Sequence, residues 1–180
     1  MTNQINYDII NTTNKERGHN MLVKKLVITT QEEPIKIKKA FALSVEEVEK
    51  YLSLEDYKHY RCWWTRTHGI YEDQATYITG DIRPNNLTSH RGYLNDHWCV
   101  RPALAIDISN TQWKIGDIFI FGKKKFKIIS ETLAFIYKDD IGECYFNYNK
   151  ETNKYFNSDL EKYIDKWFYS SLDEEIYAVP

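Results

Sequence analysis

The feature that most constrains the fold is a succession of short strand-like runs, separated by turns, in which only two segments have helical spacing. The segment GDIFIFGKKKFKIIS alternates apolar and polar residues on both sides of Gly122, so it predicts a β-hairpin whose turn carries Lys123, Lys124 and Lys125. Residues 61–108 contain many turn signals and predict a loop-rich stretch. Other strands are predicted near residues 22–30, 35–41, 74–79, 98–108, 132–137 and 142–147.

Two segments carry the signal of a helix start, in which a serine is followed three residues later by a glutamate. The pairs are Ser44 with Glu47 and Ser158 with Glu161. Apolar residues then recur at helical spacing, as Val45, Val48, Tyr51 and Leu52 in one segment and as Leu160, Tyr163, Ile164, Trp167 and Phe168 in the other. Because no linker divides the chain, we predict one α+β domain over residues 21–180, mostly antiparallel sheet with two main helices and long loops, after a polar arm over residues 1–20.

Composition limits the classes of partner. The 180 residues include 24 Lys and Arg and 26 Asp and Glu, for a formal net charge of -2, so direct binding to nucleic acid is not expected. Aromatic residues make up 15% of the chain, enough to fill a core and still leave rings on the surface. No run has the length of a membrane helix, and the first residues lack the apolar stretch of a secretory signal. We therefore predict a cytoplasmic protein that does not contact a membrane.

Cysteines and histidines raise the question of a metal site. The three cysteines, at positions 62, 99 and 144, are too scattered for a disulfide framework, which fits a reducing compartment. His97 and Cys99 could present both side chains on one face of a strand, with Cys62 and His68 as two more ligands. The spacing is not diagnostic of zinc or copper, and paired C-x-x-C motifs are absent. We therefore predict no metal and no cofactor, with these histidines packed or on the surface.

Catalytic constellations are equally unspecific in this sequence. Nucleophilic catalysis by a cysteine that a histidine activates would require Cys62 or Cys99 to lie next to His90 or His97 in the fold. No known nucleophile motif surrounds either cysteine. Acidic pairs such as 139–140 fall in predicted turns, and phosphate-binding glycine loops are missing. A non-enzymatic protein is therefore predicted.

Three motifs follow one another in the middle of the chain, namely WWTRTHG (63–69), ATYITGD (75–81) and CVRPAL (99–104). Their order and spacing resemble an uncharacterised domain family of Gram-positive bacteria and their phages, whose motifs are WWLRSPG, A-x-Y-V-x-x-D-G and G-V-R-P-A-L. FALSVEEVEKYL (41–52) is similar to the family's FLLSEEEAEKYF, which precedes its WW motif. This chain departs from the pattern at Thr67 and His68, which replace Ser-Pro, and at Cys99, which replaces a glycine.

The opening half of that family is also present, but it comes second. GDIFIFGKKKFKII and NSDLEKYIDKWFYSSLDEEI are similar to GDIIEFGGYKWRVL and NSDLRKWLNGEFY, so residues 36–108 match the family's second half and residues 113–176 its first half. The resemblance implies a circularly permuted, C-type-lectin-like fold in which the first and last strands pair. We then expect Pro180 to lie close to the strand that begins near Met21.

The resemblance also implies structural roles for several residues. Trp63 and Trp64 are expected to fill the core, with Arg66 or Arg101 donating hydrogen bonds to loop carbonyls. Trp167 lies on the apolar stripe of the second predicted helix and is expected in the interior.

A recognition surface is predicted for the stretch THGIYEDQATYITGDIRPNNLTSHRGYLNDHW, which combines rigid rings with adaptable polar groups. We predict that it binds a macromolecular protein partner through Arg66, His68, Tyr71, Tyr77, Arg83, His90, Arg91, Tyr93 and Trp98. Heavy use of Asn, Ile, Lys and Tyr indicates AT-rich coding, and the resembling family occurs in phages. The specific hypothesis is a phage or mobile-element protein that inhibits a bacterial defence nuclease or ribonucleoprotein, as anti-CRISPR proteins do.

Two alternatives stay open at the level of sequence. Carbohydrate or cell-surface recognition would suit a lectin-like fold, with possible calcium ligands at Asp81, Asn85, Asn86, Asn95 and Asp96. A metal-dependent enzyme is the other alternative. The lysines of the predicted hairpin turn, with Lys127, could contact phosphates or protect a sheet edge.

Overall fold

The computed structural model describes residues 24–25, 35–57, 61–79, 89–149 and 152–172. The strands are β1 (Lys24–Lys25), β2 (Lys36–Ala42), β3 (Trp63–His68), β4 (Gln74–Ile78), β5 (Ser89–Tyr93), β6 (His97–Cys99), β7 (Pro102–Asp107), β8 (Ile118–Phe121), β9 (Lys124–Ser130), β10 (Leu133–Ile136) and β11 (Glu143–Tyr145). The helices are α1 (Val45–Tyr51), α2 (Leu54–Tyr57) and α3 (Asp159–Ser171).

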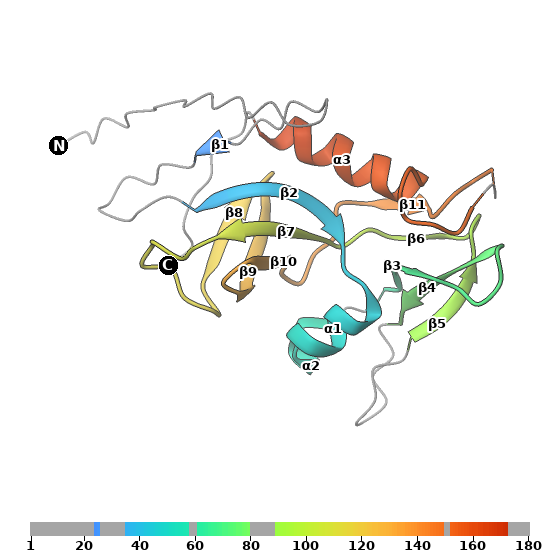
Figure 1. Ribbon diagram of the computed structural model, residues 1–180, viewed down its shortest axis with the longest axis horizontal. Coiled ribbons are helices and arrows are strands. Elements are labelled where there is room, and N and C mark those ends of the chain that lie inside the picture. Colours follow the sequence, from blue (N-terminus) through green and yellow to red (C-terminus); the bar gives the residue numbers. More distant parts are fainter. Residues whose placement is uncertain (1–23, 26–34, 58–60, 80–88, 150–151, 173–180) are drawn as a thin grey trace.

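These elements form two sheets (Figure 1). The six-stranded sheet has the order β1-β2-β7-β10-β9-β8, and the five-stranded sheet has the order β11-β6-β3-β4-β5. Neighbouring strands pair antiparallel except β3 and β6, which pair in parallel. Helix α3 packs against β2 and β11, whereas α1 contacts β3 on the other side of β2 (Figure 1). The structure is therefore α+β with mostly antiparallel sheet, as predicted.

The predicted hairpin is present as β8 and β9, but its turn is shorter than expected. Gly122 and Lys123 alone connect the strands, and both have a positive φ, of 57° and 60°. A two-residue turn with this backbone twist matches the twist of the flanking strands. Lys124 and Lys125 therefore belong to β9 and not to the turn.

Both predicted helices begin at the expected serine. At α1, the side chain of Ser44 accepts from the backbone N–H of Glu47, and the Glu47 carboxylate accepts from the N–H of Ser44, which completes the capping box. At α3, Ser158 accepts from the N–H of Glu161, while the Glu161 side chain accepts from Asn157 instead. In α3 the glutamate side chain therefore bonds to the residue before the N-cap serine, and not to the serine itself as in a complete capping box.

The stretch predicted as loop-rich contains more strand than the sequence indicated. β3 and β5 were not predicted, and α2 adds a single helical turn after α1. Residues 63–65 of β3 are all buried, because this part of the five-stranded sheet is covered on both faces. β5 is an edge strand in which only Gly92 is buried, so it lacks the apolar alternation of a half-buried strand.

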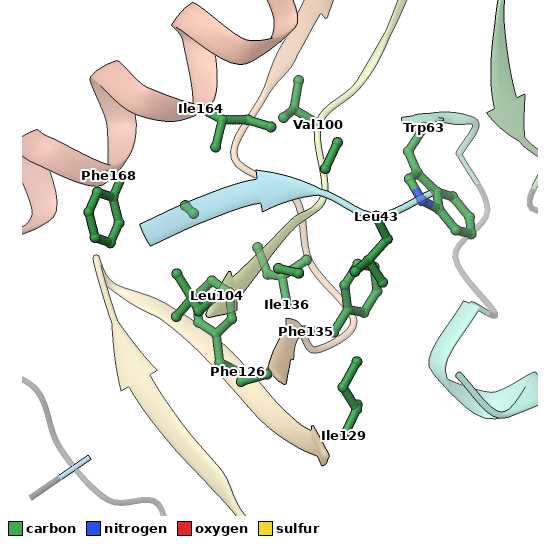
Figure 2. Packing of buried hydrophobic residues seen from close by; sticks show 14 of the residues in the cluster. Leu43, Trp63, Val100, Leu104, Phe126, Ile129, Phe135, Ile136, Ile164 and Phe168 are labelled. Carbon is green, nitrogen blue, oxygen red and sulfur yellow. The ribbon is translucent and has the colours of Figure 1, made fainter. Parts of the chain in front are cut away.

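One hydrophobic core connects the two sheets and α3. Figure 2 shows Ile164 and Phe168 of α3 on one side of β2 and Leu104, Phe126 and Ile136 on the other. Three of the aromatic residues predicted for the interior belong to this core. Trp63 and Trp64 are each 1% exposed, and Phe168 is 3% exposed. Trp167 is half-buried, with its ring against those of Phe121 and Phe126, and Tyr163 is half-buried beside it on α3.

The chain passes between the two sheets at three places. Residues 43–62 connect β2 to β3, Val100 and Arg101 connect β6 to β7, and residues 137–142 connect β10 to β11. Arg101 therefore lies at the middle crossing. It is also one of the largest fully buried side chains, with 1% exposure.

Arg101 joins this crossing to the other two by hydrogen bonds. Its Nη2 donates to the carbonyl oxygen of Asp56 in the first crossing, at 3.0 Å, and to that of Ile136 at the end of β10, at 3.1 Å. Its Nε donates to the carbonyl oxygen of Asp139 in the third crossing, at 3.1 Å. One guanidinium thus holds all three connections between the sheets.

Two aromatic rings enclose the same guanidinium. Its central carbon lies 4.7 Å from the ring centroid of Trp63 and 4.6 Å from that of Phe135. Burial lowers the pKa of Arg101 to about 10, so it still carries its charge at neutral pH. Stacking on two ring faces offsets part of the cost of taking this charge out of water.

The carboxylate of Asp56 attaches α2 to the six-stranded sheet. It is 5% exposed and accepts from Nζ of Lys127 on β9 at 2.7 Å and from the N–H and hydroxyl of Ser53 at 2.9 and 2.6 Å. Burial alone would raise the pKa of Asp56, but the hydrogen bonds from Lys127 and Ser53 outweigh it and hold that pKa below its usual value. The carboxylate of Asp56 is therefore ionised at neutral pH.

Several sequence predictions lie outside the described residues. These are the polar arm over residues 1–20, most of the strand over residues 22–30, and the proximity of Pro180 to Met21 that a circular permutation implies. The permutation and the C-type-lectin-like shape stay predictions.

Replacing Arg101 by methionine is expected to destabilise the protein by about 3 kcal/mol, because two buried carbonyl oxygens and one partly buried carbonyl oxygen lose this donor. Denaturant unfolding monitored by circular dichroism measures the loss. The matched control is Arg91→Met, at an exposed arginine on β5, which should change the free energy of unfolding by no more than about 0.5 kcal/mol. An Arg101→Met variant as stable as the control would contradict the structural role given to Arg101.

Candidate functional site

A pocket of about 840 Å³ lies between the start of α1 and strands β3, β4 and β5. Three of the predicted partner-binding residues line it, namely His68, His90 and Arg91. Glu46 on α1 and Asn153, which follows β11 in the chain, complete its polar wall. The structure thus brings together residues from five segments that are far apart in the sequence.

His68 ends β3 at the rim of this pocket. Its ring is exposed, and Nδ1 lies 2.9 Å from the carbonyl oxygen of Gly69, so Nδ1 carries the hydrogen and Nε2 is the nitrogen left for other contacts. Its backbone carbonyl accepts from the hydroxyl of Thr76 at 3.2 Å. β3 and β4 therefore fix the position of this imidazole.

A tight turn after His68 exposes two large side chains. The N–H of Gly69 donates to the carbonyl of Gln74 at 2.9 Å, and the N–H of Gln74 donates to the carbonyl of Tyr71 at 3.1 Å. Nδ2 of Asn153 donates to the same Tyr71 carbonyl at 3.0 Å. The turn is thus held at both ends, while Ile70 and Tyr71 are 68% and 62% exposed.

Three rings are stacked across the five-stranded sheet, in the order Trp98, Tyr77 and His90. The centroids of Trp98 and Tyr77 are 5.0 Å apart with the planes at 24°, and those of Tyr77 and His90 are 5.8 Å apart with the planes at 28°. Burial raises the pKa of Tyr77. Two of the predicted binding residues, Tyr77 and Trp98, are therefore half-buried and support His90, which is exposed at the end of the stack.

β5 presents the other exposed residues of the predicted set. Arg91 lies opposite Thr76 in the register, and Tyr93, which is 53% exposed, lies opposite Gln74. Because Gln74 also closes the turn of Tyr71, the two tyrosines lie at the same end of the sheet. Arg83, the remaining candidate from this stretch, lies outside the described residues.

Arg66 does not line this pocket. Its Nη1 donates to the carbonyl oxygen of Ala42 at 3.2 Å, its Nη2 forms an ion pair with Glu47, and the guanidinium lies over the ring of Phe41. These contacts join β3 to the start of α1. Arg66 borders a smaller pocket, of about 440 Å³, together with Tyr155.

Two of the three cysteines, Cys99 and Cys144, do not have the surroundings of reactive thiols. Cys99 and Cys144 are buried, and burial raises the pKa of Cys99 to about 11 and that of Cys144 to about 12. Both are therefore protonated at neutral pH, whereas the thiolate is the nucleophilic form. Nδ1 of His97 lies 3.1 Å from the carboxylate of Glu143, on the exposed surface.

No group of three or more histidine, cysteine or acidic side chains is arranged for metal binding within the described residues. Of the candidate calcium ligands, Asp96 accepts from the N–H of Tyr93 at 2.8 Å, and Asp81, Asn85 and Asn86 lie outside the described residues.

The lysines of β9 are partly neutralised within the fold. Lys124 pairs with Asp139 at 3.0 Å and Lys127 pairs with Asp56 at 2.7 Å. The hairpin therefore offers fewer available cations for phosphate contacts than its sequence suggests.

Sequence reasoning did not identify Glu46, Ile70 or Asn153 as part of this site. Asn153 is 84 residues from Gly69, and no local motif indicates that the two meet. Ile70 lies inside the predicted stretch, between His68 and Tyr71, but an isolated apolar residue in a turn carries no specific signal that would single it out.

Comparison with protein-family models, with curated proteins and with solved structures finds no significant match for this chain. The resemblance to the WWLRSPG domain family therefore stays a prediction. Among the described helices, none is both long and apolar enough to cross a membrane.

The variant Gly69→Ala tests the close packing of the turn. A Cβ at Gly69 would lie 2.6 Å from both Cβ and the backbone oxygen of Gln74, so backbone atoms would have to shift. We expect a loss of about 1–3 kcal/mol in the free energy of unfolding, measured by denaturant titration. Ile70→Ala, one residue on and exposed, is the control and should leave stability within about 0.5 kcal/mol of the wild type. Equal stability of the two variants would contradict the packing described.

Proposed function

We propose that this protein is a non-enzymatic binding module that recognises a protein partner. The contact surface comprises His68, Ile70, Tyr71, Arg91 and Tyr93, and is called the recognition surface below. The observation that carries the proposal is the position of exposed Ile70 and Tyr71 beside a polar pocket lined by His68 and Arg91.

The composition of the recognition surface supports a protein partner. Exposed tyrosine and isoleucine side chains bury large areas with few rotatable bonds, and tyrosine and arginine are enriched among the residues that dominate binding energy at protein interfaces. The surface rests on a fixed framework, because Asn153 holds the Tyr71 carbonyl and the ring stack supports His90. Little conformational entropy would then be lost on binding.

The specific form of the proposal is inhibition of a bacterial defence nuclease inside the host cell, by a protein of a phage or another mobile element. Two observations support it: the resemblance of the motifs to a family found in Gram-positive bacteria and phages, and an amino-acid composition, rich in Asn, Ile, Lys and Tyr, that is typical of AT-rich coding. The step from these observations to nuclease inhibition is an analogy with small phage proteins that block host machinery.

Affinity capture tests the proposal. The wild type, Tyr71→Ser and Tyr169→Ser are immobilised and incubated with lysate of a low-GC Gram-positive bacterium, and captured nucleases are assayed with and without added protein. Tyr169, on α3, is 57% exposed against 62% for Tyr71, so it is a matched control away from the recognition surface.

We expect the Tyr71→Ser variant to bind the captured partner roughly tenfold more weakly or worse, and the Tyr169→Ser variant to bind like the wild type. Inhibition of nuclease activity should follow the same order. A partner that is retained by Tyr71→Ser and lost by Tyr169→Ser would contradict the proposed surface, and capture without any effect on nuclease activity would contradict the inhibitory role.

A further inference from the structure

Arg91 gives the pocket one cation that the fold does not use. It is exposed on β5, the edge strand, opposite Thr76. Within the described part of the chain, no carboxylate lies within salt-bridge distance of Arg91. The other arginines described, Arg61, Arg66 and Arg101, are engaged by carboxylates or carbonyl oxygens of the protein. A guanidinium of this kind is geometrically suited to two parallel hydrogen bonds with a carboxylate.

The imidazole of His68 lies at the rim of the same pocket. His68 comes from the end of β3 with Nε2 left for an external contact, because Nδ1 faces the carbonyl of Gly69. His90 also borders the pocket, but its ring stacks on Tyr77 and therefore lies on the opposite face of β5 from Arg91. Nε2 of His68 can donate a hydrogen bond to an anion when the ring is protonated, and the protonated ring also adds positive charge.

Neutral hydroxyl groups add further donors. Oγ1 of Thr67 accepts from the N–H of Val45 at 2.9 Å, which leaves its own hydrogen to donate. Ser89, at the start of β5, also lines the pocket and is exposed. The pocket therefore has donors on both its α1 side and its β5 side.

Glu46 places a negative charge in the same pocket as the positive charge of Arg91. Among the described residues it is the one carboxylate that lines the pocket. Its own backbone N–H and the side chain of Ser44 lower its pKa, so it is ionised at neutral pH. A single permanent cation and a single permanent anion fit a small anionic group better than a chain of phosphates, which needs several cations.

We propose that this pocket binds the carboxylate of a glutamate or aspartate in an acidic segment of the partner protein, with Arg91 as the main contact, the hydroxyls of Thr67 and Ser89 as further donors, and His68 as a donor when it is protonated. The inference rests on the proposed function for the source of the carboxylate. Ile70, which also lines the pocket and is 68% exposed, gives an apolar contact beside it. The segment recognised therefore has an acidic residue next to an apolar one.

Titration of the full-length protein with synthetic peptides tests this inference. The probes are acetyl-Leu-Glu-Leu-amide, its glutamine counterpart acetyl-Leu-Gln-Leu-amide, and inorganic phosphate, each followed by changes in backbone amide chemical shifts. The variants are Arg91→Gln, Glu46→Gln and, as a control, Lys166→Gln on the exposed side of α3.

We expect the glutamate peptide to shift the amides of residues 67–70 and 89–91 and to bind at least roughly tenfold more tightly than the glutamine peptide. Arg91→Gln should remove most of this preference. Glu46→Gln should strengthen binding severalfold, because the opposing carboxylate is gone, and Lys166→Gln should change nothing. Opposite effects at Arg91 and Glu46 are not expected from a general loss of folding.

Equal binding of the two peptides, or an unchanged affinity in Arg91→Gln, would overturn the inference. Phosphate that binds more tightly than the glutamate peptide at the same amides would also overturn it, because the pocket would then select phosphate groups. A partner captured through Tyr71 that binds Arg91→Gln normally would reject this inference and leave the proposed function intact. Peptide binding that depends on Arg91, with no partner captured, would reject the proposed function and retain the carboxylate site.

Discussion

The fold depends on one buried cation at the junction of its two sheets. Arg101 lies where the chain leaves β6 for β7, and its guanidinium donates to carbonyl oxygens in both of the other segments that pass between the sheets. The rings of Trp63 and Phe135 enclose it. Burying a charge costs less when it is hydrogen-bonded, and Nε and Nη2 of Arg101 find acceptors only when the three crossings adopt this arrangement together.

This junction sets the position of the pocket. Trp63, which stacks on Arg101, begins β3, and His68 ends the same strand at the pocket rim. On the other side, the ion pair of Arg66 with Glu47 attaches α1 to β3 and thereby places Glu46 opposite β5. Interior contacts thus determine the distance between the two walls.

The sequence predicts correctly those elements whose formation is determined by residues close together in the chain. The hairpin of β8 and β9 and the serine caps of α1 and α3 follow from turn and capping chemistry within a few residues. β3 escaped prediction because its first residues are buried on both faces, and β5 because an exposed edge strand lacks apolar alternation. The same holds for the site: His68, His90 and Arg91 were expected together from one stretch, whereas Asn153 joins them only through contacts across 84 residues.

The central claim is that the partner covers the end of the five-stranded sheet that carries the recognition surface. Hydrogen exchange, followed by mass spectrometry on the free protein and on its complex, measures this directly. The account predicts increased protection in residues 67–74 and 89–93 when the partner is bound, with no change in α3 or in the β8–β9 hairpin. Protection confined to α3 or to that hairpin, with none at residues 67–74, would contradict it.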